Sequence, residues 1–99
     1  MNANQRRFKV FAREYMTCRD PMDEKGVVCK GDGTVEVRSS YFYRHGRSAE
    51  GHAAKVAEQM KMDEAPKGWT VVSSRDEYHS WPKKLSYFVA VLRFDGVTV

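Results

Sequence analysis

Residues 85–94 have the sequence LSYFVAVLRF, the most strongly strand-forming stretch of the chain. Aromatic and β-branched residues fill it, and Asp95-Gly96 is a turn signal directly after it. Side chains alternate between the two faces of a strand. We expect one set to face a helix, namely Phe88, Ala90, Leu92 and Phe94. We expect the other set on the opposite face, namely Tyr87, Val89, Val91 and Arg93.

Strand and turn signals continue on the N-terminal side of this stretch. Residues 69–74 predict a strand, and the polar segment 75–84 predicts a turn. Further upstream, residues 27–30 and 34–44 flank the turn sequence Gly31-Asp32-Gly33, which indicates a short strand followed by a longer one.

The N-terminal segment shows the same alternation. Phe8, Val10 and Ala12 recur at every second position, which predicts a strand over residues 7–16. The stretch that follows, residues 18–26, is dense in turn-forming and acidic residues and predicts a loop.

One segment has helical spacing. Ser48 is a favourable N-cap, and Glu50 lies in the first turn, where the helix dipole stabilises an acid. Pro66 and Gly68 are expected to end the helix. Its apolar stripe consists of Ala49, Ala53, Val56, Ala57 and Met60.

These elements predict an α+β fold. The order β-β-β-α-β-β gives an antiparallel sheet of four to five strands with one α-helix packed on one face. The 99 residues are expected to form a single domain, residues 1–99, with residues 1–6 and 96–99 as tails. Because one helix covers one face, the other face stays open to a partner or to water.

Composition favours an acidic or phosphate-bearing partner. The net charge is +4, from 17 basic and 13 acidic residues. The N-terminus lacks the apolar stretch of a secretory signal, and no run is long enough to span a bilayer. We therefore expect a cytoplasmic protein with no membrane contact, in which Cys18 and Cys29 are free thiols.

The open sheet face is the candidate functional surface. Aromatic rings interleaved with Arg and Lys suit single-stranded nucleic acid, and the same residue types are common at the centre of protein interfaces. The face could also pack on a second copy to form a homodimer. The candidate binding residues are Lys9, Phe11, Arg13, Tyr15, Arg38, Phe42, Arg44, Arg47, Tyr87 and Arg93.

Residues 44–48, Arg-His-Gly-Arg-Ser, resemble the Arg-His-Gly motif of histidine phosphatases. The resemblance implies that His45 is a phosphoryl-accepting nucleophile and Arg44 a phosphate clamp. That family also needs a second catalytic His, for which only His52 and His79 remain, together with further Arg residues and a longer parallel α/β domain, for which this chain is too short. We expect instead a turn at which Arg44, Arg47 and the helix N-terminus at Ser48 offer an anion site.

No metal or cofactor is expected. Cys18, Cys29, His45 and His52 are spaced more widely than the paired ligands of structural zinc sites. No phosphate-binding glycine loop or nucleophilic triad is present in the sequence. The sequence therefore predicts a binding protein and not an enzyme.

In size and layout the whole chain resembles small phage-encoded inhibitors of host machinery, such as anti-CRISPR proteins. The resemblance implies steric block of a host protein or nucleoprotein complex, a CRISPR effector for example, in the host cytoplasm. The alternative is a nucleic-acid-binding module that uses the aromatic and basic sheet face.

Overall fold

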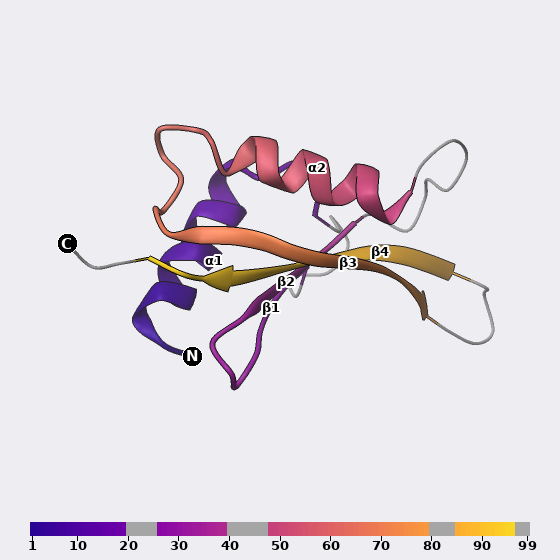
Figure 1. Ribbon diagram of the computed structural model, residues 1–99, viewed down its shortest axis with the longest axis horizontal. Helices are drawn as coiled ribbons and strands as arrows, with labels where there is room; N and C mark the ends of the chain where they lie inside the picture. Colours follow the sequence, from indigo (N-terminus) through magenta and orange to yellow (C-terminus); the bar gives the residue numbers. More distant parts are fainter. Residues whose placement is uncertain (20–25, 40–47, 80–84, 97–99) are drawn as a thin grey trace.

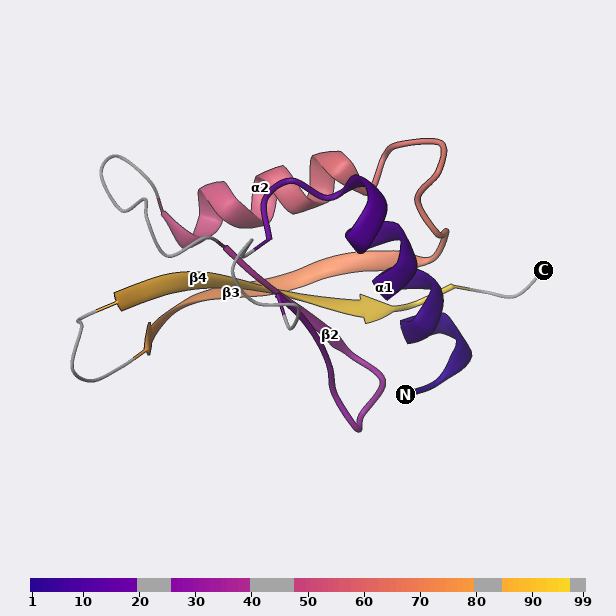
Figure 2. The same cartoon turned by 180° about the vertical axis from the view of Figure 1, so that it is seen from behind.

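The computed structural model describes residues 1–19, 26–39, 48–79 and 85–96. The described residues form two helices and four strands, and each helix is followed by two strands (Figures 1 and 2). Neither helix of the described part has the length and apolar content needed to cross a bilayer. The elements are α1 (Ala3–Tyr15), β1 (Val27–Cys29), β2 (Val35–Arg38), α2 (Ala49–Gln59), β3 (Trp69–His79) and β4 (Leu85–Phe94).

The four strands form one antiparallel sheet in the order β1-β2-β4-β3. This confirms the α+β class and the antiparallel sheet. β4 has the bounds that its sequence predicts, and β1 and β2 form the hairpin expected around Gly31-Asp32-Gly33, where Gly33 adopts a positive φ of 91°. The helix count and the element order differ from the prediction.

The main correction concerns the N-terminal segment, where the strand expected over residues 7–16 is the helix α1. Phe8, Phe11 and Ala12 are buried together with Met16, which is a spacing of three and four residues. Val10, expected to share a face with Phe8, is 42% exposed. The segment forms a helix because helical spacing buries both Phe8 and Phe11. A strand would place these two rings on opposite faces.

The expected tail at residues 1–6 is also corrected, because residues 3–6 form the first turn of α1. Asn2 is the N-cap, and its side chain accepts a hydrogen bond from the Gln5 backbone N–H. The Gln5 side chain in turn accepts from the Asn2 backbone N–H, which completes a capping box. Two otherwise unsatisfied donors of the helix start are thereby paired.

Two element ends differ from the sequence prediction. β3 runs through to His79, although residues 75–84 were expected to form a turn. α2 begins after the predicted N-cap Ser48, whose hydroxyl accepts from Gly51 N–H at 3.0 Å, but it ends at Gln59, well before Pro66. The strand expected over residues 34–44 ends as β2 at Arg38; residues 40–44 lie outside the described part.

The core lies between the two helices and one face of the sheet. α2 packs over β3 and β4, and α1 packs beside β1 (Figure 1). The core residues are Phe8, Phe11, Ala12 and Met16 of the α1 segment, Val56 of α2, Ala65 between α2 and β3, and Val27, Val35, Val37, Trp69, Ala90 and Leu92 of the sheet. Ala90, Leu92 and Phe94 thus face the helices as predicted.

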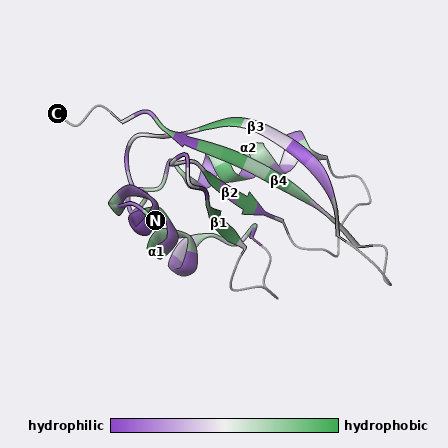
Figure 3. Ribbon diagram, turned by 90° about the horizontal axis from the view of Figure 1, so that it is seen from below, coloured by the Kyte–Doolittle hydropathy of each residue, from purple (hydrophilic) through white to green (hydrophobic). Residues whose placement is uncertain are grey.

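The opposite sheet face is not covered by either helix. Figure 3 looks onto this face, and the part of β3 that follows the bulge at Val71/Ser73 is hydrophilic. The strand register places the alternate residues on it: Val28, Glu36, Arg38, Thr70, Ser73, Arg75, Glu77, Tyr87, Val89, Val91 and Arg93.

Candidate docking surface

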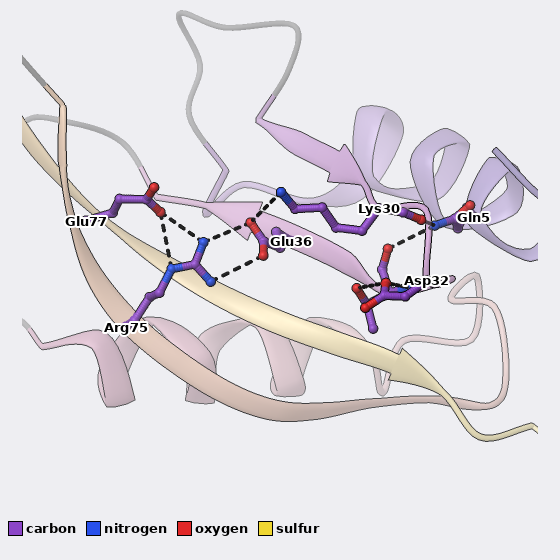
Figure 4. A network of polar contacts seen from close by, with 7 residues as sticks. Gln5, Lys30, Asp32, Glu36, Arg75 and Glu77 are labelled. Atoms are coloured by element: carbon purple, nitrogen blue, oxygen red, sulfur yellow. Dashed lines mark hydrogen bonds and ion pairs between the residues drawn. The ribbon is translucent and has the colours of Figure 1, made fainter.

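The start of α1 is fixed to the β1–β2 turn by one buried side chain. Gln5 is 2% exposed, and its Nε2 donates to the carbonyl oxygens of Lys30 at 2.7 Å and Thr34 at 2.9 Å (Figure 4). The same turn is closed by the bond from Gly33 N–H to the Lys30 carbonyl. The helix start and the hairpin turn therefore form one hydrogen-bonded unit.

The end of α1 is fixed to α2. Gln59, at the end of α2, donates from Nε2 to Thr17 Oγ1 at 2.8 Å and accepts from the Thr17 backbone N–H at 3.3 Å. Arg19 then returns to the helix and donates to the Arg13 carbonyl at 3.1 Å. A basic side chain at a helix C-terminus satisfies a terminal carbonyl and complements the dipole. Both ends of α1 are thus held, so the helix presents one defined side to solvent.

The solvent side of α1 is strongly basic. Four basic residues stand on the helix against one acid, Glu14, so α1 carries most of the net charge of +4. We call the exposed side of this helix the α1 basic face. Among the described residues, none forms an ion pair with the four cations. The face consists of Arg6, Arg7 and Arg13, which are exposed, and the partly exposed Lys9, with the exposed Val10 between them.

The open sheet face, by contrast, is largely neutralised by its own ion pairs. Arg75 donates to both oxygens of Glu36, at 2.9 and 3.2 Å, and also to Glu77 at 2.9 Å (Figure 4). Lys30 Nζ lies 3.8 Å from the same Glu36 carboxylate. The hydrogen bond with Glu36 raises the pKa of Arg75, so the guanidinium is charged at every ordinary pH. This network spans β2 and β3 and leaves little net charge on the face.

A second contact on the sheet face involves Tyr87, an aromatic ring that was expected to be open and is instead buried. The Arg38 guanidinium carbon lies 5.2 Å from the centre of the Tyr87 ring, a cation–π arrangement. Tyr87 is only 4% exposed, and burial raises the pKa of its phenol. Val89, placed between Arg38 and Arg75 by the strand register, is fully buried.

The predicted binding residues therefore fall into four groups. Arg38, Tyr87 and Arg93 share the open sheet face as expected, with Arg93 bonded to Asp95 at 2.9 Å. Phe11 is in the core, which corrects its placement on an exposed face. Lys9, Arg13 and Tyr15 are on α1 and not on the sheet. The remaining three, Phe42, Arg44 and Arg47, lie outside the described residues.

Sequence reasoning missed the residues that define and orient the α1 basic face. The sequence pattern places Arg6 in a tail and Arg7 at the start of a strand, and it indicates no contact for Gln5. A local signal for the helix was present, since Asn2 and Gln5 have the spacing of a capping box. The two carbonyls that Gln5 binds are 25 and 29 residues away, and no local pattern indicates them.

The buried His52 and the half-buried Cys18 lie outside this face and have shifted pKa values. His52 is 7% exposed, and its Nε2–H donates to the Val37 carbonyl at 2.9 Å; burial lowers the pKa of the imidazole. Burial also raises the pKa of the Cys18 thiol to about 11, so Cys18 is a weak nucleophile at neutral pH. Within residues 1–19, 26–39, 48–79 and 85–96, no three His, Cys, Asp or Glu side chains gather as a metal site would require.

Comparison with protein families, with curated proteins and with solved structures found no match for this chain.

Proposed function

We propose that this protein is a non-enzymatic binding protein that docks on a larger, negatively charged macromolecular partner through the α1 basic face. The supporting observation is the concentration of four cations and one acid on a single exposed helix. Charge of one sign on one surface accelerates encounter with a partner of opposite charge and disfavours partners of like charge.

The way α1 is held also favours a binding role. Gln5 fixes the helix start to the β1–β2 turn, and Gln59 fixes its end to α2. A surface that is rigid before binding loses less conformational entropy on association. The arginine and lysine side chains must still order, but the backbone that carries them is already in place.

The open sheet face is the weaker candidate surface. Arg75 is occupied by Glu36 and Glu77, and Tyr87 is buried beneath Arg38. A partner that bound there would have to compete with ion pairs already formed. For this reason the α1 basic face replaces the sheet face as the proposed docking surface.

Under this proposal the protein acts by occupying a surface of its partner. That is the steric mode which the resemblance to small phage-encoded inhibitors implies, with the host cytoplasm as the location. The partner is then a host protein or nucleoprotein complex with an acidic or phosphate-bearing surface.

The proposal is tested by gel filtration after the purified protein is mixed with host-cell lysate. We expect the wild type to elute with a large complex and the double variant Arg6→Gln/Arg13→Gln to elute alone. The matched control is Lys61→Gln/Lys67→Gln, which removes the same charge from exposed positions outside α1. Elution of both double variants with the complex, or of the wild type alone, would rule out docking through this face.

A further inference from the structure

We infer that the α1 basic face binds the phosphate backbone of double-stranded nucleic acid, without reading its sequence. This inference rests on the proposed function and names the chemistry of the partner. It is carried by the position of three cations along the helix, by the absence of an apolar centre among the described residues of this face, and by the burial of two of the described candidate stacking rings, Phe11 and Tyr87.

The spacing of the cations fits a row of phosphates. Arg6, Lys9 and Arg13 are three and seven residues apart, so they share one side of α1. The helical rise places Arg6 and Arg13 about 10 Å apart along the axis. A duplex carries one negative charge per about 1.7 Å of its length, so three phosphates lie easily within that reach. An arginine fork matches phosphate geometry with two parallel hydrogen bonds.

The composition of the face argues against a protein or a membrane as the occupant. Stable protein interfaces have a desolvated apolar or aromatic centre, and the large apolar side chain exposed among these cations is Val10 alone, within the described residues. An amphipathic helix that enters a membrane needs a free apolar side. That side of α1, with Phe8 and Phe11, is in the core.

The form of nucleic acid follows from the aromatic residues. Proteins that hold single strands stack bases on exposed rings. Among the described rings proposed for this role, Phe11 and Tyr87 are each 4% exposed, and Phe42 lies outside the described residues. Tyr15 is 39% exposed but is stacked on Phe11, with ring centres 5.6 Å apart. With phosphate contacts alone, binding is expected to be independent of sequence and at least as strong for duplex as for single strand.

The experiment is a fluorescence-anisotropy titration of labelled 20-base-pair duplexes of two unrelated sequences, at salt concentrations from 50 to 300 mM. We expect equal affinity for both duplexes and a slope of about −3 in log K against log salt, since each phosphate contact contributes about 0.9. Arg6→Gln/Arg13→Gln should weaken binding at least tenfold and reduce the slope by about two. The control variant Lys61→Gln/Lys67→Gln should leave the affinity and the salt slope nearly unchanged.

Several outcomes would overturn the inference. These are no binding to duplex at 50 mM salt, equal losses in the two double variants, or competition by polyglutamate as effective as competition by unlabelled duplex. Binding to phosphatidylserine vesicles in place of duplex would identify a membrane instead. If duplex binding fails while the lysate complex still depends on Arg6 and Arg13, this inference falls and the proposed function stands. If the complex also fails to form, both fall.

Discussion

Gln5 Nε2 donates a hydrogen bond of 2.7 Å to the carbonyl oxygen of Lys30, 25 residues further along the chain. The same nitrogen donates to the Thr34 carbonyl at 2.9 Å, so one amide spans the two ends of the β1–β2 turn. Its Oε1 meanwhile accepts from the backbone of Asn2. A single buried side chain thus joins the start of α1 to the sheet and sets the direction in which the α1 basic face points.

Replacing this side chain tests how much the connection stabilises the fold. Gln5→Met keeps the length but removes two hydrogen bonds to carbonyls and half of the capping box. At about 1 kcal/mol for each of the three hydrogen bonds lost, we expect the free energy of unfolding to fall by about 3 kcal/mol. Urea denaturation followed by circular dichroism measures the change. Arg6→Gln, next to it but exposed, should change stability by less than about 0.5 kcal/mol. Equal effects of the two variants would show that Gln5 has no special role.

His52 predicts a loss of stability in mild acid. Its pKa is lowered in the fold by burial, with a further contribution from nearby Lys55, so the folded state disfavours the charged imidazole. Stability is therefore fully present above the ordinary pKa of 6.5 and falls as the pH drops below it. Denaturant unfolding at pH 7.5 and pH 5.0 should show a larger loss for the wild type than for His52→Gln, which cannot take up the proton. Parallel pH profiles for the two proteins would contradict this role.

The raised pKa of Cys18 predicts that its thiol reacts slowly with alkylating agents. Because burial raises its pKa from 9.0 to about 11, the thiolate fraction at pH 8 falls roughly 100-fold. In a Cys29→Ala variant, where Cys18 is the remaining thiol, iodoacetamide should react at least tenfold more slowly with folded than with denatured protein. Because the folded state favours the protonated thiol, the raised pKa also makes the free energy of unfolding depend on pH. This contribution to stability is fully present below pH 9 and is lost as the pH rises from 9 to 11. Equal alkylation rates in the two states would be incompatible with a raised pKa at the half-buried Cys18.

The Glu36–Arg75 pair is expected to stabilise the sheet without serving the docking surface. Glu36→Gln removes a carboxylate that is 13% exposed and bonded twice by Arg75, whose own side chain is 42% exposed. After allowance for solvent screening, we expect the free energy of unfolding to fall by about 1 kcal/mol, and by less at 0.5 M salt. Glu58→Gln, exposed on α2, is the control for loss of one negative charge. A salt-independent loss would indicate that packing, and not charge, explains the effect.

The parts of the fold that the sequence predicts correctly are those with local signals. β4 has a continuous run of strand formers, the β1–β2 hairpin has its turn glycines, and the start of α2 has Ser48. Each of these signals lies within a few residues of the element it specifies. The bounds of β3 and α2 were less accurate, because pairing with β4 and packing on the sheet decide where those elements end.

The N-terminal segment could not be assigned from alternation alone. Phe8, Val10 and Ala12 satisfy a period of two, yet Phe8, Ala12 and Met16 also satisfy helical spacing. The choice depends on which side chains the rest of the molecule buries, and the core buries both Phe8 and Phe11. The capping-box residues Asn2 and Gln5 were the local evidence for the helix.

The candidate binding surface also differs from the sequence prediction, because contacts between distant residues decide which face carries free charge. Lys9, Arg13 and Tyr15 were chosen correctly as accessible residues but were placed on a sheet together with Arg38 and Tyr87. The pairing of Arg75 with Glu36, 39 residues apart, neutralises that sheet face and is not visible in any local pattern. Composition could indicate a basic protein, but only the fold locates the excess charge on α1.

The most direct test of the α1 basic face is residue-specific. Backbone amide chemical shifts of ¹⁵N-labelled protein are recorded by NMR during titration with an unlabelled 12-base-pair duplex. We predict that the largest shift changes cluster in residues 6–13 of α1, with small changes at Arg75, Val91 and Arg93 on the sheet. The largest changes at those sheet positions, or none anywhere at low salt, would contradict the account.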